Sequence, residues 1–82
     1  MIRMEKRSRL APSDVMNKAV ALFGPGGLDL EVKDRAECCA RFEGGGGYVF
    51  IQAGEGKNGK GSEVQVEGRE WDYHIRQFLT SI

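Results

Sequence analysis

Apolar and polar residues alternate along four short stretches of this 82-residue chain, which is the pattern of β-strands with one buried face. The stretches cover residues 28–33, 37–43, 48–53 and 63–67. Successive side chains of a strand point to opposite faces, so each stretch predicts a strand with one side on the core and the other toward solvent.

The stretch 2–10 follows the same rule, with its apolar residues at even positions and its arginines at odd ones. We therefore expect a fifth strand here. If it pairs with 63–67, its outward arginines lie beside Glu63 and Glu67, which accounts for both charge clusters.

Two further segments carry apolar residues at helical spacing, and the first begins at Pro12-Ser13-Asp14. We expect the Ser13 hydroxyl to accept a hydrogen bond from a first-turn amide, and Asp14 to suit the positive end of the helix. Glycine and proline over residues 24–27 end this helix.

The second helix is expected to begin near Arg69 or Glu70, because Gly68 is expected to end the strand before it. Its apolar positions fall on one face at helical spacing. They are Trp71, Ile75, Phe78, Leu79 and Ile82.

Loop lengths set the expected register of neighbouring strands. A short loop after the second strand places Val32 opposite Cys38 on the inner face. The glycine run 44–47 places Phe42 opposite Val49. The predicted order is β-α-β-β-β-β-α in one α+β domain, a two-layer sandwich with both helices on one face of an antiparallel sheet.

Composition narrows the function by exclusion. Lysine and arginine together number 12, as do aspartate and glutamate, so a net charge of zero gives no reason to expect nucleic acid or an anionic membrane as partner. No stretch resembles a membrane span or a secretory leader, and we expect a cytoplasmic protein. Cys38 and Cys39 would point to opposite faces of a strand, with Cys38 in the core, and could not bond without distortion.

Chemical motifs are few. Residues 54–59 fit the nucleotide-binding pattern G-x-G-x-x-G, but a strand follows them where that pattern requires a helix N-terminus. Two adjacent cysteines and His74 do not supply three or four converging metal ligands. No nucleophile, base and orienting group can be assembled, so the sequence predicts no catalytic residue, no metal and no cofactor.

The candidate binding residues are Tyr48 and Phe50, with Arg41 beside them and Trp71 on the last helix. The expected register puts Tyr48 and Phe50 on the helix-free face, where exposed rings stack nucleic-acid bases or form an interface with a protein or a second copy. Alternatively, the rings pack across strands against Arg41. On the four strands that follow the first helix, six acidic and two basic side chains are expected on this face, a field that repels phosphate and disfavours nucleic acid. They are Asp29, Glu31, Glu37, Glu43, Glu63 and Glu67, against Lys33 and Arg41. The outward arginines of the first strand are the evidence against that expectation.

The segment Leu10–Val15, a strand running into a helix through Ala-Pro, resembles the start of the START and polyketide-cyclase-like superfamily. The closing strand, the break at Gly68 and the helix from Trp71 to Ile82 resemble its end, and the element order is similar to the TATA-box-binding-protein-like grouping. The resemblance implies a helix-grip shape with a hydrophobic ligand under the last helix. This chain is about half the usual length of that superfamily. So small a core needs its apolar side chains for packing, which leaves fewer of them to line a deep cavity.

Three functions remain open. The leading hypothesis is a non-catalytic binding or interaction module, with another protein or a second copy of the chain as partner. The alternatives are a small carrier of an apolar ligand, held between the sheet and the last helix, and a small enzyme that uses the same pocket.

Overall fold

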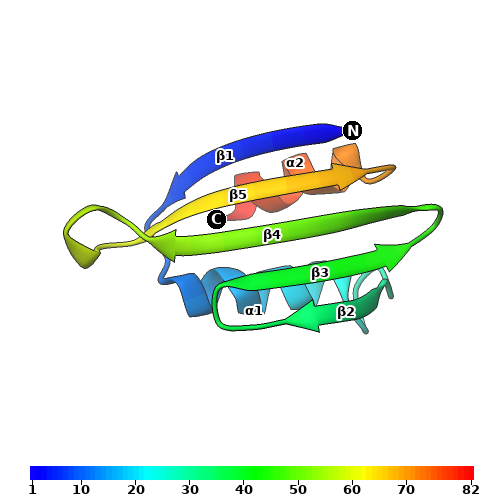
Figure 1. Cartoon of the computed structure of the whole chain (residues 1–82), viewed down its shortest axis with the longest axis horizontal. Coiled ribbons are helices and arrows are strands. Elements are labelled where there is room, and N and C mark those ends of the chain that lie inside the picture. Colours follow the sequence, from blue (N-terminus) through cyan, green and yellow to red (C-terminus); the bar gives the residue numbers. More distant parts are fainter.

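A computed structural model describes residues 1–82 as a five-stranded antiparallel sheet with two helices on one face (Figure 1). The elements are β1 (Ile2–Ser8), α1 (Pro12–Phe23), β2 (Glu31–Arg35), β3 (Cys39–Gly44), β4 (Gly47–Glu55), β5 (Ser62–Arg69) and α2 (Asp72–Ser81), with a short 3-10 turn at Lys57–Gly59. Their order across the sheet is β1-β5-β4-β3-β2, so the first strand lies beside the last. The predicted α+β fold and its element order are confirmed.

The core lies between the sheet and the helices, and alternate strand residues fill it together with the inner faces of α1 and α2. Phe23 of α1 lies at its centre, with its ring centroid 5.6 Å from that of Phe42 and 5.8 Å from that of Phe78. α1 packs on β3 and β4, whereas α2 packs on β5. The opposite face of the sheet is free of helices, and we call it the outer face.

The register of β3 and β4 is as predicted, with Phe42 opposite Val49. The turn between the two strands is formed by Gly45 and Gly46, whose φ angles are 60° and 80°. Glycine adopts positive φ without steric cost, and a two-residue turn of this kind matches the twist of the strands that it joins. The glycine run therefore fixes this hairpin.

The predicted register of β2 and β3 is wrong. Val32 lies opposite Phe42 rather than Cys38, and a bulge at Lys33 shifts the pairs that follow. Cys38 consequently lies in the turn before β3, where it is exposed and not part of the core, while Cys39 is half-buried.

β2 begins later than predicted because the residues before it fold back onto the end of α1. The Leu28 amide donates to the Leu22 carbonyl, and the Leu30 amide donates to the Phe23 carbonyl, both at 2.9 Å. Asp29 has a φ of 57° between them. These backbone bonds use the free carbonyls of the last helical turn, so the alternating residues 28–30 serve as a helix cap instead of a strand.

α1 starts where the sequence predicts, but the expected Ser13 cap is wrong. Ala11 precedes the helix, Pro12 occupies its first turn, and no side chain caps it. Because the helix begins one residue before Ser13, that hydroxyl lies within the first turn instead of at the cap position.

Gly68 does not end β5. It is buried within the strand and is paired with Ile2 on one side and Val49 on the other. A Cβ at this position would lie 2.5 Å from Cδ1 of Ile75. Glycine therefore allows α2 to approach the sheet closely, and the helix begins at Asp72 rather than at Arg69 or Glu70.

Candidate functional site

Charged side chains form rows across the outer face. One row holds, in register from β1 to β2, Arg3, Glu67, Phe50, Arg41 and Asp34. Arg3 is opposite Glu67 on one side of the phenylalanine, and Arg41 is opposite Asp34 on the other. Directly opposed charges of unlike sign stabilise a sheet. The row connects all five strands.

A cluster of four side chains, which we call the outer-face cluster, lies beside and within this row. The guanidinium carbon of Arg41 is 4.6 Å from the centroid of the Tyr48 ring, a cation–π contact. Nε of Arg41 donates to Oε2 of Glu43 at 2.8 Å, and the Tyr48 hydroxyl donates to Oε2 of Glu67 at 2.9 Å. These contacts link β3, β4 and β5.

The hydrogen bonds of the cluster shift three of its pKa values. The bond between Arg41 and Glu43 raises the pKa of the guanidinium and lowers the pKa of the carboxyl. The bond to Glu67 raises the pKa of the Tyr48 phenol, and desolvation raises it further. Each shift moves the pKa away from neutral pH, so these three groups are not tuned for acid–base catalysis.

We expect the substitution Glu67→Gln to lower the pKa of Tyr48, because it replaces a charged acceptor by a neutral one. The measurement is an absorbance titration of the phenolate in a Tyr73→Phe background, where Tyr48 is the one remaining tyrosine. Because the pKa is raised in the folded state, the bond contributes stability below the ordinary phenol pKa. That contribution is lost as the pH rises through the raised pKa.

Glu63→Gln is the control for this titration, because Glu63 lies on the same strand and face but is opposite Gly54 and Arg7. It should leave the pKa of Tyr48 unchanged. Equal pKa values in the Glu63 and Glu67 variants would contradict the bond between Tyr48 and Glu67.

Tyr48 and Phe50 lie on the outer face, as the register predicted, but both are half-buried. The large apolar side chains that are exposed are Met1 and Tyr73, which lie outside β4. The two rings therefore form no exposed aromatic patch, and the contact of Arg41 with the Tyr48 ring is of the predicted cross-strand kind. A binding role for these residues stays a prediction.

Trp71 lies apart from the other three candidate residues. Its Nε1 donates to the carbonyl of Gly44 at 3.0 Å. Its ring covers Gly45, where an added Cβ would lie 2.7 Å from Cζ2. Trp71 thus anchors the start of α2 on the turn between β3 and β4.

The acidic excess expected on the last four strands is not present on the outer face as a whole. Asp29 and Glu37 lie outside the strands, whereas Arg3, Arg7 and Arg69 belong to strand positions of this face. The charges of the face are Arg3, Arg7, Lys33, Arg41 and Arg69 against Glu5, Glu31, Asp34, Glu43, Glu63 and Glu67. This near balance neither repels phosphate strongly nor forms a basic patch, so charge no longer argues against nucleic acid and does not favour it.

The two edges of the sheet differ. β2 is short, bulged and charged, which is how proteins commonly protect an edge from pairing. β1 has seven residues, each in unbroken register with β5, and no strand on its other side (Figure 1). Backbone N–H and C=O groups of alternate β1 residues therefore face solvent.

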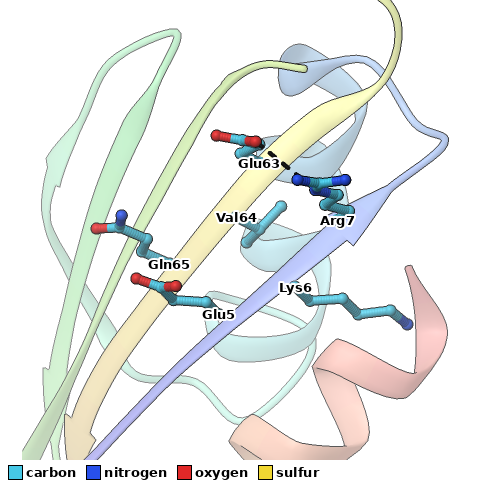
Figure 2. A pocket seen from close by; sticks show the side chains of 6 residues that line it. All are labelled: Glu5, Lys6, Arg7, Glu63, Val64 and Gln65. Carbon is cyan, nitrogen blue, oxygen red and sulfur yellow. Dashed lines mark ion pairs between the residues drawn. The ribbon is translucent and has the colours of Figure 1, made fainter. Parts of the chain in front are cut away.

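β1 also holds the C-terminal end of α2. Nζ of Lys6 donates to the carbonyl of Leu79, and Oγ of Ser8 donates to the carbonyl of Ile82 at 3.0 Å. A cation is favourable at this end of a helix. Figure 2 shows Lys6 extending toward α2, while Arg7 and Glu63 point toward one another across β1 and β5, with Nε and Oε1 3.7 Å apart.

The inner-face side chains of β1 are incompletely covered. Ile2 and Met4 are half-buried, because α2 packs on β5 and leaves the β1 side of the sheet at the rim of the core. Sequence reasoning predicted the pairing of β1 with β5 but missed the open edge. The predicted pairing already implied this open edge, because a first strand that pairs only with the last strand has no neighbour on its other side.

The main hollows of the surface are open and are lined mostly by polar side chains. One of them lies over β1 and β5, between Glu5, Arg7 and Gln65 (Figure 2). Between the sheet and α2, the fully buried side chains of Ile75 and Phe78 fill the space.

No group of three or more His, Cys, Asp or Glu side chains is arranged to hold a metal ion. Both helices are too short and too polar to span a membrane. Comparisons of the chain with protein-family models, with curated proteins and with solved structures find no match.

Proposed function

We propose that this protein is a non-catalytic interaction module that pairs with a second copy of itself through the free edge of β1. The observation that carries the proposal is that edge, which is long, regular and unpaired, with Ile2 and Met4 half-buried beside it. An antiparallel β1 from a second copy satisfies the open backbone groups and covers both side chains, in the manner of other strand-addition complexes. The pairing is isologous, so a twofold axis closes it at a dimer.

Charge complementarity selects one register for this dimer. A twofold axis through Met4 places Arg3 of each copy opposite Glu5 of the other on the outer face, and Met4 opposite Met4 on the inner face. An axis through Glu5 would oppose two glutamates, and it would also set Arg3 against Arg7. Axes through Arg3 or Lys6 would each oppose two cations. Opposite charges in paired positions favour the first register.

Lys6 points inward on this edge, and an inward charge is one device that keeps edges from pairing. Here the ammonium group is bound at the end of α2 through the carbonyl of Leu79. In the selected register, the aliphatic part of Lys6 lies beside Ile2 of the second copy. The charge is thus held away from the new strand pair.

Two observations favour this proposal over the carrier and the enzyme. Ile75 and Phe78 of α2 are fully buried and belong to the packed core, which favours a filled interior over a ligand cavity between the sheet and this helix. The pKa shifts of Arg41, Glu43 and Tyr48 lead away from the values that acid–base chemistry requires.

We expect Glu5→Arg to weaken self-association about tenfold or more. The substitution turns two attractive pairs with Arg3 into two repulsive ones, and each opposed pair in a sheet contributes about 0.2–1 kcal/mol. Sedimentation velocity over a range of protein concentrations measures the dissociation constant. Within its own sheet, Glu5 is opposite the neutral Gln65, so the monomer should keep its stability.

A mixing experiment makes this test specific. Glu5→Arg and Arg3→Glu should each associate more weakly than the wild type, but an equimolar mixture should regain association, because both outer-face pairs between residues 3 and 5 then join opposite charges. Arg3→Glu also places a glutamate opposite Glu67 within its own sheet, so its unfolding midpoint is measured alongside. Glu37→Arg, an exposed loop residue, is the control for the change in net charge and should behave as the wild type. A wild-type chain that is monomeric at every concentration, or a Glu5→Arg dimer of unchanged affinity, would contradict the proposal.

A further inference from the structure

The two cysteines lie at the turn between β2 and β3, with their Sγ atoms 3.1 Å apart. The expectation that they point to opposite faces is wrong, because only Cys39 belongs to β3 and the turn residue Cys38 does not follow the alternation of a strand. Cys38 is exposed and Cys39 is half-buried. Two thiols so close, one of them open to solvent, are arranged to react as a pair.

We propose that Cys38 and Cys39 form a thiol–disulfide exchange site, which reacts with small-molecule disulfides and closes to a reversible disulfide between the two neighbouring residues. The turn lies at the opposite side of the sheet from β1. The site is therefore independent of the proposed self-association, and either can fail without the other.

The surroundings assign different roles to the two sulfurs. Cys38 is accessible to a reagent. The hydrogen bond with Cys38 raises the pKa of the Cys39 thiol, and burial raises it further. Because a reagent reaches the exposed Cys38 sulfur more readily than the half-buried Cys39 sulfur, we assign Cys38 as the first nucleophile and Cys39 as the resolving thiol.

The reaction proceeds in two displacements. The Cys38 thiolate attacks one sulfur of the reagent disulfide, whose S–S bond breaks; one thiolate leaves and takes up a proton, and a mixed disulfide remains on Cys38. Cys39 then loses its proton and attacks Sγ of Cys38, and the second reagent thiolate leaves. The two protein thiols are oxidised by two electrons, and the reagent disulfide is reduced to two thiols.

The backbone makes the product readily reducible. Adjacent Cα atoms are about 3.8 Å apart across a trans peptide, less than the roughly 4.4–6.8 Å that disulfides span without strain. Strained, exposed disulfides are the labile ones. Closure also disturbs two hydrogen bonds, because the Cys38 carbonyl accepts from the Ala53 amide and the Cys39 carbonyl accepts from the Ala36 amide, both at 2.7 Å.

The test is to incubate the reduced protein with excess oxidised glutathione and to follow the intact mass with time. We expect a transient gain of one glutathionyl group, then a stable species lighter than the starting protein by two hydrogen atoms. Peptide mapping should place the new bond between Cys38 and Cys39, and dithiothreitol should reverse it. Exchange rates of the Ala36 and Ala53 amides should rise in the oxidised form.

Two single substitutions separate the steps. Cys39→Ser should form the mixed disulfide at the wild-type rate and stop there, whereas Cys38→Ser should react several-fold more slowly. Stable mixed disulfides on the wild-type chain, disulfide-linked dimers as the main product, or no reaction would overturn the proposal. Equal rates for the two variants would overturn the assignment of Cys38 as the first nucleophile.

Discussion

Replacing Phe78 by alanine is expected to destabilise the protein by about 3–5 kcal/mol, the cost of a large cavity in a core. The side chain is fully buried, and its ring packs edge-on against Phe23 at a centroid distance of 5.8 Å. A domain of this size has a total stability of only about 5–15 kcal/mol, so a large share of the molecules should unfold under mild denaturant. The measurement is the midpoint of urea unfolding followed by circular dichroism.

The matched control is Gln77→Ala, at the neighbouring exposed position of the same helix. It removes one contact, the hydrogen bond from Gln77 to the Tyr73 hydroxyl, and should change the stability by about 0.5 kcal/mol or less. If Phe78→Ala unfolds at the same midpoint as Gln77→Ala, α2 is not docked on β5 through this ring.

Adding a single methyl group at Gly68 is expected to destabilise the fold by about 1–3 kcal/mol, as overpacking of a tight core does. In Gly68→Ala, the new Cβ would lie 2.5 Å from Cδ1 of Ile75 and 2.8 Å from the carbonyl oxygen of Tyr48. Ile75 is fully buried, in a core whose close packing resists displacement of a side chain, and the Tyr48 oxygen belongs to the backbone of the neighbouring strand. The midpoint of thermal unfolding measures the effect.

Gly54→Ala tests whether the loss is specific to Gly68. It adds the same methyl group to β4, where nothing lies within 4 Å of the new Cβ, and should leave the midpoint nearly unchanged. Adding Ile75→Val to Gly68→Ala removes Cδ1 and should restore part of the stability, because two residues in contact are not additive. If Ile75→Val instead destabilises the Gly68→Ala protein by the usual cost of this substitution, about 0.5–1.5 kcal/mol, the contact with Ile75 does not cause the destabilisation by Gly68→Ala.

Sequence patterns predict those parts of the fold that local chemistry determines. The hairpin of β3 and β4 has the correct register because Gly45 and Gly46 adopt positive φ in a two-residue turn. The pairing of β1 with β5 was predicted from charge, and Arg3 and Arg7 do lie opposite Glu67 and Glu63.

Other parts depend on contacts that a linear pattern does not carry. The alternation of residues 28–30 is typical of a strand, yet backbone bonds to the end of α1 hold this segment outside the sheet. The bulge at Lys33 then changes the register, which places Cys38 in the turn. Glycine commonly ends a strand, so the sequence predicted that β5 ends at Gly68. The residue instead lies inside β5, where the absence of a side chain lets Ile75 approach the sheet.

The candidate site shows the same division. The outer-face position of Tyr48 and Phe50 follows from alternation, but their half-burial results from neighbours on other strands, such as Arg41 and Glu67. The spacing of apolar residues predicts Trp71 on the apolar face of the last helix. Its hydrogen bond to the Gly44 carbonyl depends on tertiary packing, which the spacing does not show. The helix-grip resemblance, and a binding role for these residues, stay predictions.

The pairing of β1 with β5 also has a consequence for the order of folding. Its closest pair in the sequence, Ser8 and Ser62, is separated by 54 positions, whereas Gly44 and Gly47 close the β3–β4 hairpin over a two-residue turn. Loop-closure entropy grows with the length of the segment, and contacts between distant residues slow folding. We therefore expect the hairpin to form early and β1 to dock last, so the strand whose edge we propose as the interface is the one that completes the sheet.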